Sequence, residues 1–254
     1  MNGAATSGSN DGRGLPQFPG AVGLTRLRAY SWDAQDGMPG GSPHMHLACA
    51  ECYCVIAGSG RLQTMTVDGV REVPLTVGDV IWFTPGTIHR TINDDGALQV
   101  IVVMQNGGLP ESGDAVLTFP PGYLIDAETY ARTVSLAGPD GTPTAERSRA
   151  RRDLAVQGFT ELRSRWDAGD HAALDEFYAA ATALVKPKLG IWRERLSEGA
   201  VAEARNTSDV IDALAEGRFD HLKASAVARI EQPGAETFGM CGMLRAYDPV
   251  RTGQ

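Results

Sequence analysis

The chain has 254 residues, which is enough to bury the core of one domain and leave a substantial appendage. Its formal net charge is -8, and an acidic surface repels a phosphate backbone, so we expect no nucleic-acid partner. No apolar run reaches the roughly 18 residues of a membrane span, and residues 1–20 lack the apolar segment of a secretion signal, which predicts a cytoplasmic protein without membrane contact. The four cysteines are too few for a disulfide framework in a chain of this size, so reduced thiols are expected.

The first half of the chain has the sequence pattern of a β protein. Residues 1–20 are rich in Gly, Ser and Asn and are expected to be a disordered leader. From about residue 22 to residue 104, short β-branched or apolar runs alternate with Gly, Pro and Asp, and Gly58-Ser59-Gly60 and Asp68-Gly69 predict tight hairpins. Regularly spaced short strands favour a sandwich or barrel, which we assign to residues 21–136.

The second half is expected to be helical. A Gly/Pro stretch at residues 137–143 marks the domain boundary, and apolar residues then recur at spacings of three and four, as at Phe159, Leu162 and Trp166. We therefore expect residues 144–254 to form a helical extension. Its part from Pro143 to about Lys223 should pack on the barrel, because its apolar stripe would otherwise be exposed. The apolar, helix-poor segment 238–247 is expected to be a last strand that returns to the barrel. A solvated helix face is expected for the cluster Arg147, Arg149, Arg151 and Arg152.

Three histidines and one glutamate form the densest set of potential metal ligands. His44 and His46 are two residues apart, so on an extended strand both imidazoles project to the same face. Glu51 opens the next apolar run, and His89 comes from a separate segment. Neutral imidazoles and one carboxylate suit a divalent Fe, Mn, Ni, Co, Cu or Zn ion.

These residues resemble the two conserved motifs of the cupin superfamily, over about residues 38–93. The first motif consists of His-x-His, then three or four residues, Glu, six residues and Gly. It is matched by His44, His46, Glu51 and Gly58. The second motif is matched at its expected spacings by Gly78, Gly86, His89 and Asn93. Two positions that are not ligands depart from the pattern, since Thr84 stands where proline is usual and Met38 where glycine is expected. The resemblance implies a jelly-roll barrel that binds one metal in its interior, commonly as a homodimer.

Strand parity selects the residues that line the expected pocket. Tyr53 and Val55 share the inward face of Glu51, and Thr91 and Asn93 share the face of His89. Trp82 is included as a further candidate for substrate binding, and Glu51 and Tyr53 are the candidate catalytic residues. By the same parity Cys52 and Cys54 face away from the metal and are expected to be packing residues.

Three functions compete for such a site. Four protein ligands on an octahedral ion leave two adjacent positions open, which a substrate and O2 could share in an Fe(II) dioxygenase. A metal-dependent isomerase or epimerase would instead polarise a carbonyl while Glu51 or another base moves a proton. The third alternative is a non-catalytic barrel that binds a small molecule. On the habits of the superfamily we favour an Fe(II)-dependent oxygenase that acts on a small polar organic molecule.

Overall fold

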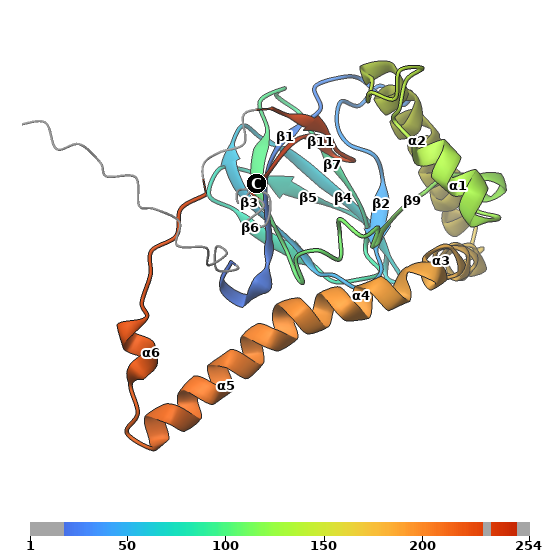
Figure 1. Cartoon of the computed structure of the whole chain (residues 1–254). Helices are drawn as coiled ribbons and strands as arrows, with labels where there is room; N and C mark the ends of the chain where they lie inside the picture. Colours follow the sequence, from blue (N-terminus) through green and yellow to red (C-terminus); the bar gives the residue numbers. More distant parts are fainter. Residues whose placement is uncertain (1–17, 231–234, 248–254) are drawn as a thin grey trace, which may run out of the picture.

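The alternating strand pattern folds into two antiparallel sheets that face each other, with helices at one side (Figure 1). The computed structural model describes residues 18–230 and 235–247, so the leader expected at residues 1–20 lies almost wholly outside the described residues. The expectation of a β-barrel with a C-terminal helical region is confirmed.

The barrel contains eleven strands among the described residues. One sheet has the order β10 (Thr237–Phe238), β11 (Gly242–Tyr247), β1 (Gly23–Ala29), β8 (Gln99–Met104), β3 (Glu51–Ala57) and β6 (Val80–Phe83). The other has the order β5 (Gly69–Leu75), β4 (Gly60–Thr66), β7 (Ile88–Ile92), β2 (His44–His46) and β9 (Ala115–Leu117). Leu27 on β1 lies opposite both Val100 on β8 and Leu244 on β11, so the region where a last strand is expected joins the sheet beside the first strand.

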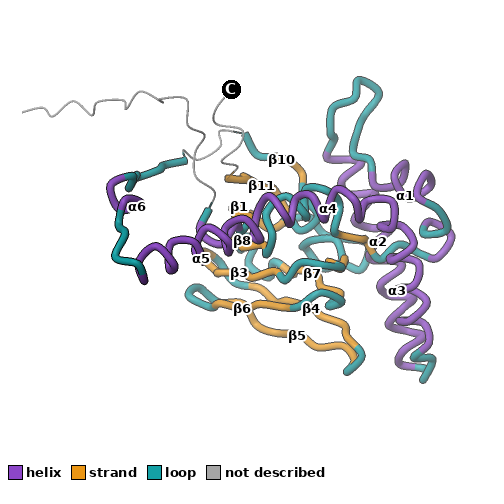
Figure 2. Tube along the Cα trace, turned by 60° about the horizontal axis from the view of Figure 1, so that its bottom comes forward, coloured by secondary structure: helices purple, strands orange, loops and turns teal. Residues whose placement is uncertain are grey.

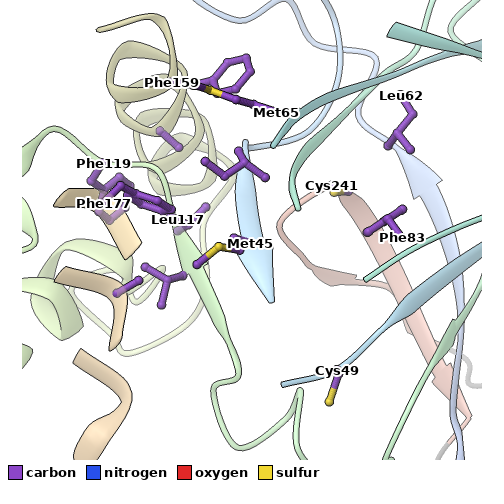
Figure 3. Close-up of a cluster of buried hydrophobic side chains, with 14 of the residues drawn as sticks. Met45, Cys49, Leu62, Met65, Phe83, Leu117, Phe119, Phe159, Phe177 and Cys241 are labelled. Carbon is purple, nitrogen blue, oxygen red and sulfur yellow. The ribbon is translucent and has the colours of Figure 1, made fainter. Parts of the chain in front are cut away.

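The two sheets differ in what covers their outer faces. Along β3 every second residue is buried, as expected of a strand with one solvated face, whereas β2, β7 and β9 are buried at every position. The helices α2 (Ala145–Asp167) and α3 (Ala172–Val185) cover this second sheet, and Figure 3 shows Leu117, Phe119 and Phe177 gathered between them and the strands. The approach is close at Gly158, where an added Cβ would lie 2.1 Å from the Thr118 carbonyl oxygen.

The remaining helices differ in how closely they pack on the barrel. The helix α1 (Ala127–Val134) precedes the expected boundary, and α4 (Leu189–Leu196), α5 (Ala202–Ala215) and α6 (Asp220–Lys223) follow α3. In both Figure 1 and Figure 2, α5 and α6 extend away from the barrel. The expectation that the whole helical unit packs on the barrel is therefore wrong for α5, where Ile211 is 60% and Leu214 is 51% exposed. Periodicity shows that an apolar stripe exists but does not say which surface covers it. No helix in the described ranges is long and apolar enough to cross a membrane.

The arginine cluster at the start of α2 is solvated only in part: Arg147 and Arg149 are exposed as expected, whereas Arg151 and Arg152 are not. Arg152 is 1% exposed and donates to the backbone oxygens of Trp32 and Asp33, at 2.6 Å each. Arg151 donates to Gly239 O at 2.6 Å, and the Arg149 guanidinium lies 4.4 Å from the centroid of the Trp32 ring. The loop before β2 leaves carbonyl groups without sheet partners, and α2 supplies the donors that they require.

We predict that Arg152→Ala lowers the free energy of unfolding by about 2–4 kcal/mol, because several buried carbonyl groups lose their donor. Urea unfolding of the full chain measures the change. Arg147→Ala is the matched control, since Arg147 is exposed on the same helix and its loss should cost less than about 0.5 kcal/mol. Equal stability of the two variants would contradict this account of the cluster.

Candidate metal centre

Strands from both sheets bring the four expected ligands to one place inside the barrel. His44 and His46 lie on β2, and the pairing of β2 with β7 sets His44 directly opposite His89. Glu51 opens β3 in the facing sheet. One ligand atom from each of the four residues lies within 4.8 Å of those of the others, and all four residues are buried.

The donor atoms at the centre of this cluster are poorly satisfied without an ion. Glu51 Oε2 lies 3.1 Å from Nε2 of His46 and 3.1 Å from Nε2 of His89. Neither Glu51 Oε2 nor His89 Nε2 has a hydrogen-bond partner within the described part of the chain. Because a buried polar atom without a partner costs free energy, and because imidazole and carboxylate suit first-row divalent ions, the residues fit a metal.

Each imidazole is oriented through its other ring nitrogen. Nδ1 of His44 lies 2.9 Å from Ser42 O, and Nδ1 of His89 lies 3.1 Å from Thr87 O. Nδ1 of His46 lies 3.2 Å from Asp114 Oδ2. Since these oxygens accept a hydrogen bond, Nδ1 carries the proton and Nε2 is left to bind a metal.

The charges in the cluster shift the pKa values of its members. Burial acts to raise the pKa of Glu51, but the adjacent His46 and His89 outweigh it and hold that pKa well below its usual range. Burial acts to lower the pKa of His46, yet the adjacent carboxylates of Asp114 and Glu51 raise it to about 9. Burial, together with the neighbouring His89 and His46, lowers the pKa of His44 well below its ordinary value. The site therefore carries an ionised carboxylate at neutral pH.

Comparison with known proteins agrees with this geometry. The family model described as "Cupin domain" matches residues 32–104, a segment that contains all four ligands. Residues 32–104 therefore carry a cupin domain. No curated protein sequence matches it significantly.

Several solved structures are similar to this cupin over part of their length. CapF, a capsular polysaccharide assembling protein from Staphylococcus aureus, is 20% identical over 42% of this chain and 32% of its own, with a TM-score of 0.30. A predicted oxalate decarboxylase from Thermotoga maritima is 21% identical over 33% of this chain and 64% of its own, with a TM-score of 0.25. WlaRA, a TDP-fucose-3,4-ketoisomerase from Campylobacter jejuni, is 9% identical over 37% of this chain and 64% of its own, with a TM-score of 0.29. Each of these matches spans less than two thirds of the other protein.

Three of the candidate pocket residues point into the barrel. Tyr53 is fully buried, its hydroxyl donates to Cys241 Sγ at 3.7 Å, and it accepts from Thr91 Oγ1 at 3.5 Å. Val55 and Thr91 are also buried, on β3 and β7. Cys52 lies opposite Trp82 on the outer side of β3, and no cysteine of the described residues joins the metal cluster.

Two expected pocket residues have other roles. Trp82 is 71% exposed on the outer face of the sheet, because its neighbour Phe83 takes the inward position opposite Glu51. Asn93 is buried, but its side-chain amide donates to the carbonyl oxygens of Ala29 and Tyr30 and accepts from Leu98 N. With its polar atoms engaged by backbone, Asn93 holds chain segments together and is not available to bind a substrate.

Sequence reasoning missed three residues beside the cluster. The Phe83 ring lies 4.2 Å from that of His89 and 5.4 Å from that of Tyr53, centroid to centroid. Strand parity could have placed Phe83 if the register with β3 had been known. Asp114 and Cys241 carry no local signal, because loops and long chain separations bring them to the site.

Two open spaces beside the barrel lie apart from the metal cluster. A cavity of about 580 Å³ lies outside the second sheet, where Met45 and Thr87 face Tyr178 and Thr182 of α3. Met45 points there because strand parity turns it away from its neighbours His44 and His46. None of the four ligands lines this cavity.

We predict that the protein binds one divalent ion and that His89→Ala weakens metal affinity more than about 100-fold, since a first ligand is lost rather than an outer partner. Elemental analysis after dialysis gives the stoichiometry. His171→Ala, which removes an exposed histidine outside the cluster, should retain the metal. Stoichiometric metal in the His89 variant would show that the site has been assigned wrongly.

Metal affinity should also depend on pH. The raised pKa of His46 stabilises the metal-free protein fully below the ordinary value of 6.5, and this contribution is lost as pH rises through about 9. A metal on Nε2 must displace that proton, so affinity should rise about tenfold per pH unit below pH 9 and level off above it. Competition titrations between pH 6.5 and 9 test this, and a flat profile would contradict it.

Proposed function

We propose that this cupin is a metal-dependent enzyme acting on a small organic molecule, and that its reaction is an O2-dependent oxidation supported by Fe(II). The observation that carries the proposal is the pair of buried, unpartnered donor atoms, Glu51 Oε2 and His89 Nε2, at the centre of the cluster. An iron held by His44, His46, Glu51 and His89 would supply the capacity to activate O2. Mn, Ni, Co, Cu and Zn remain alternatives for the same donors.

The walls around the cluster suit chemistry that must exclude bulk water. Phe83 packs on His89, and Val55, Val102 and Met104 are buried on the inner faces of β3 and β8. Apolar walls protect a reactive species from side reactions with water and strengthen electrostatic interactions inside the barrel. Their contribution is to exclude water and to hold an uncharged or singly charged substrate.

The titratable groups near the cluster favour oxidation over isomerisation. Burial, followed by the charges of Cys241 and Glu51, raises the pKa of Tyr53 well above 10, so its hydroxyl stays protonated and can donate but not accept a proton at neutral pH. Burial raises the pKa of Cys241 to about 11. Asp114 is already engaged by His46 and by backbone amides. An isomerase requires a free base, and the described residues beside the cluster offer none besides the metal ligands themselves.

These properties assign roles to the candidate catalytic residues. Glu51 would hold the ion, and the Tyr53 hydroxyl would turn its single proton from Cys241 Sγ to an oxygen of the substrate. The net charge of -8 repels polyanions at long range, so the proposed substrate is a neutral, phenolic or monocarboxylate compound.

We predict that Fe(II)-loaded protein consumes O2 in the presence of a member of this substrate class and that turnover stops under argon. An oxygen electrode over a panel of small phenols and monocarboxylates, with mass spectrometry of the products, measures it. His89→Ala should be inactive and His171→Ala fully active. Undiminished turnover without oxygen, giving a product of the same mass as the substrate, would replace the oxygenase with the isomerase.

We also propose that the protein is a homodimer, as its cupin domain suggests. The terminal strand β6 of the six-stranded sheet exposes Val80 by 56% and Trp82 by 71% on its outer face. Exposed apolar side chains beside a sheet edge favour association.

Sedimentation velocity should therefore show a dimer, and the double variant Val80→Glu/Trp82→Glu should shift it to monomer. Val67→Glu is the matched control, because Val67 is 68% exposed in the turn between β4 and β5, two strands of the other sheet. A monomeric wild-type protein, or a dimer that the double variant leaves intact, would remove this surface from consideration.

A further inference from the structure

Asp114 is a buried carboxylate placed against one ligand of the proposed metal centre. It directly precedes β9, and the pairing of His46 with Ala115 brings it beside the last residue of β2. Its side chain is 0% exposed, and Oδ2 lies 3.2 Å from His46 Nδ1. A fully buried charge needs surrounding donors, so its position demands an explanation.

The donors around Asp114 come from the ligand and from the turn that follows it. Oδ1 accepts from Leu47 N at 3.1 Å and from Ala48 N at 2.7 Å, while Oδ2 accepts from Cys49 N at 3.1 Å. One carboxylate thus joins His46 to the turn that leads into β3 and Glu51.

His46 needs such a support more than the other imidazoles do. β2 is three residues long, and although all three pair with β9, its register with β7 contains only the pair His44–His89, so His46 has a strand partner on one side alone. The Nδ1 atoms of His44 and His89 are held by neutral carbonyl oxygens two residues before each, whereas that of His46 is held by a charged group 68 residues away.

The loop that carries Asp114 is itself anchored by the helical extension. Lys188 Nζ donates to Gly113 O at 3.1 Å, and Trp192 Nε1 donates to Ser112 O at 3.1 Å. Trp192 is buried on α4. The helices therefore fix the position of the carboxylate on which the orientation of His46 depends.

We propose that Asp114 is a positioning residue of the metal centre, which holds His46 with Nδ1 protonated and Nε2 directed at the ion and adds a second negative charge beside it. The inference rests on the proposed metal binding. A carboxylate behind a ligating histidine raises the basicity of the ligand, and removing such a partner lowers metal affinity about 10–100-fold.

The competing explanation is that Asp114 only caps the turn at residues 47–49. A matched pair of variants distinguishes this capping role from the positioning of His46. Asparagine has no charge and only one acceptor oxygen where aspartate has two. Asp114→Asn can therefore keep the contact with His46 or the contacts with the turn amides, but not all of them. Gln105→Leu removes another side-chain acceptor of the same turn, which accepts from Ala50 N at 3.1 Å, without touching His46.

Co(II) titration of the full chain, followed by its visible absorption spectrum, is the test. We expect Asp114→Asn to bind Co(II) about 10–100-fold more weakly than wild type and with a shifted spectrum, and Gln105→Leu to match wild type in both. Wild-type affinity and spectrum in Asp114→Asn, or equal losses in the two variants, would overturn the role. Failure of the wild-type protein to bind Co(II), Fe(II) or Zn(II) would instead refute the proposed function itself, and the inference with it.

A measurement on the wild-type chain covers the case in which Asp114→Asn does not fold. Nitrogen-15 NMR of the Zn(II)-loaded protein reports which ring nitrogen of His46 binds the ion. Coordination through Nε2 with a protonated Nδ1 supports the role of Asp114, and coordination through Nδ1 overturns it.

Discussion

A carboxylate inside an apolar barrel is the constraint on which the rest of this molecule depends. Glu51 is 6% exposed, and an isolated buried charge of this kind would destabilise the fold. The structure meets the constraint by directing imidazoles from the facing sheet at the carboxylate, two of them with Nε2 at 3.1 Å from Oε2. The same arrangement leaves donor atoms unpartnered, which connects the stability of the barrel to the binding of a cation.

The helices α2 and α3, which cover the five-stranded sheet, also help to hold those imidazoles in place. β2 carries two ligands yet is only three residues long, and it pairs with β9 at all three residues but with β7 only at His44. Helix α3 reaches it through Tyr178, whose hydroxyl donates to Gly86 O, while Gly86 N donates to His46 O at 2.9 Å. The extension is thus part of the support of the site as well as a cover for apolar surface.

The interior beside the cluster combines a metal-binding donor set with groups that stay protonated. Tyr53, Thr91 and Cys241 form a hydrogen-bonded set, and burial raises the pKa values of the phenol and the thiol. These side chains can donate hydrogen bonds but have little capacity to accept a proton. This asymmetry is the physical basis for preferring an oxidation over a proton transfer as the reaction.

Local sequence was sufficient to indicate a sandwich or barrel, because hairpin turns and the two-residue period of strands are short-range properties. The jelly-roll barrel was implied by the resemblance to the cupin motifs. The spacing of His44 and His46, the position of Glu51 and the resemblance of the motifs indicated a donor set before any contact was known. Tertiary structure alone decided which side chains surround those donors. Phe83 replaced Trp82 at the inner face because the register of β6 with β3 is a pairing between distant segments.

The same limit applies to the charged residues. Arg152 resembles a solvated helix residue in sequence, and only the docking of α2 on the loop before β2 makes its guanidinium a donor to buried carbonyls. Asp114 lies 68 residues from His46, so no periodicity could connect them. For α5, periodicity correctly indicated a helix, but its apolar side remains exposed in the described chain because periodicity specifies a face and not its partner.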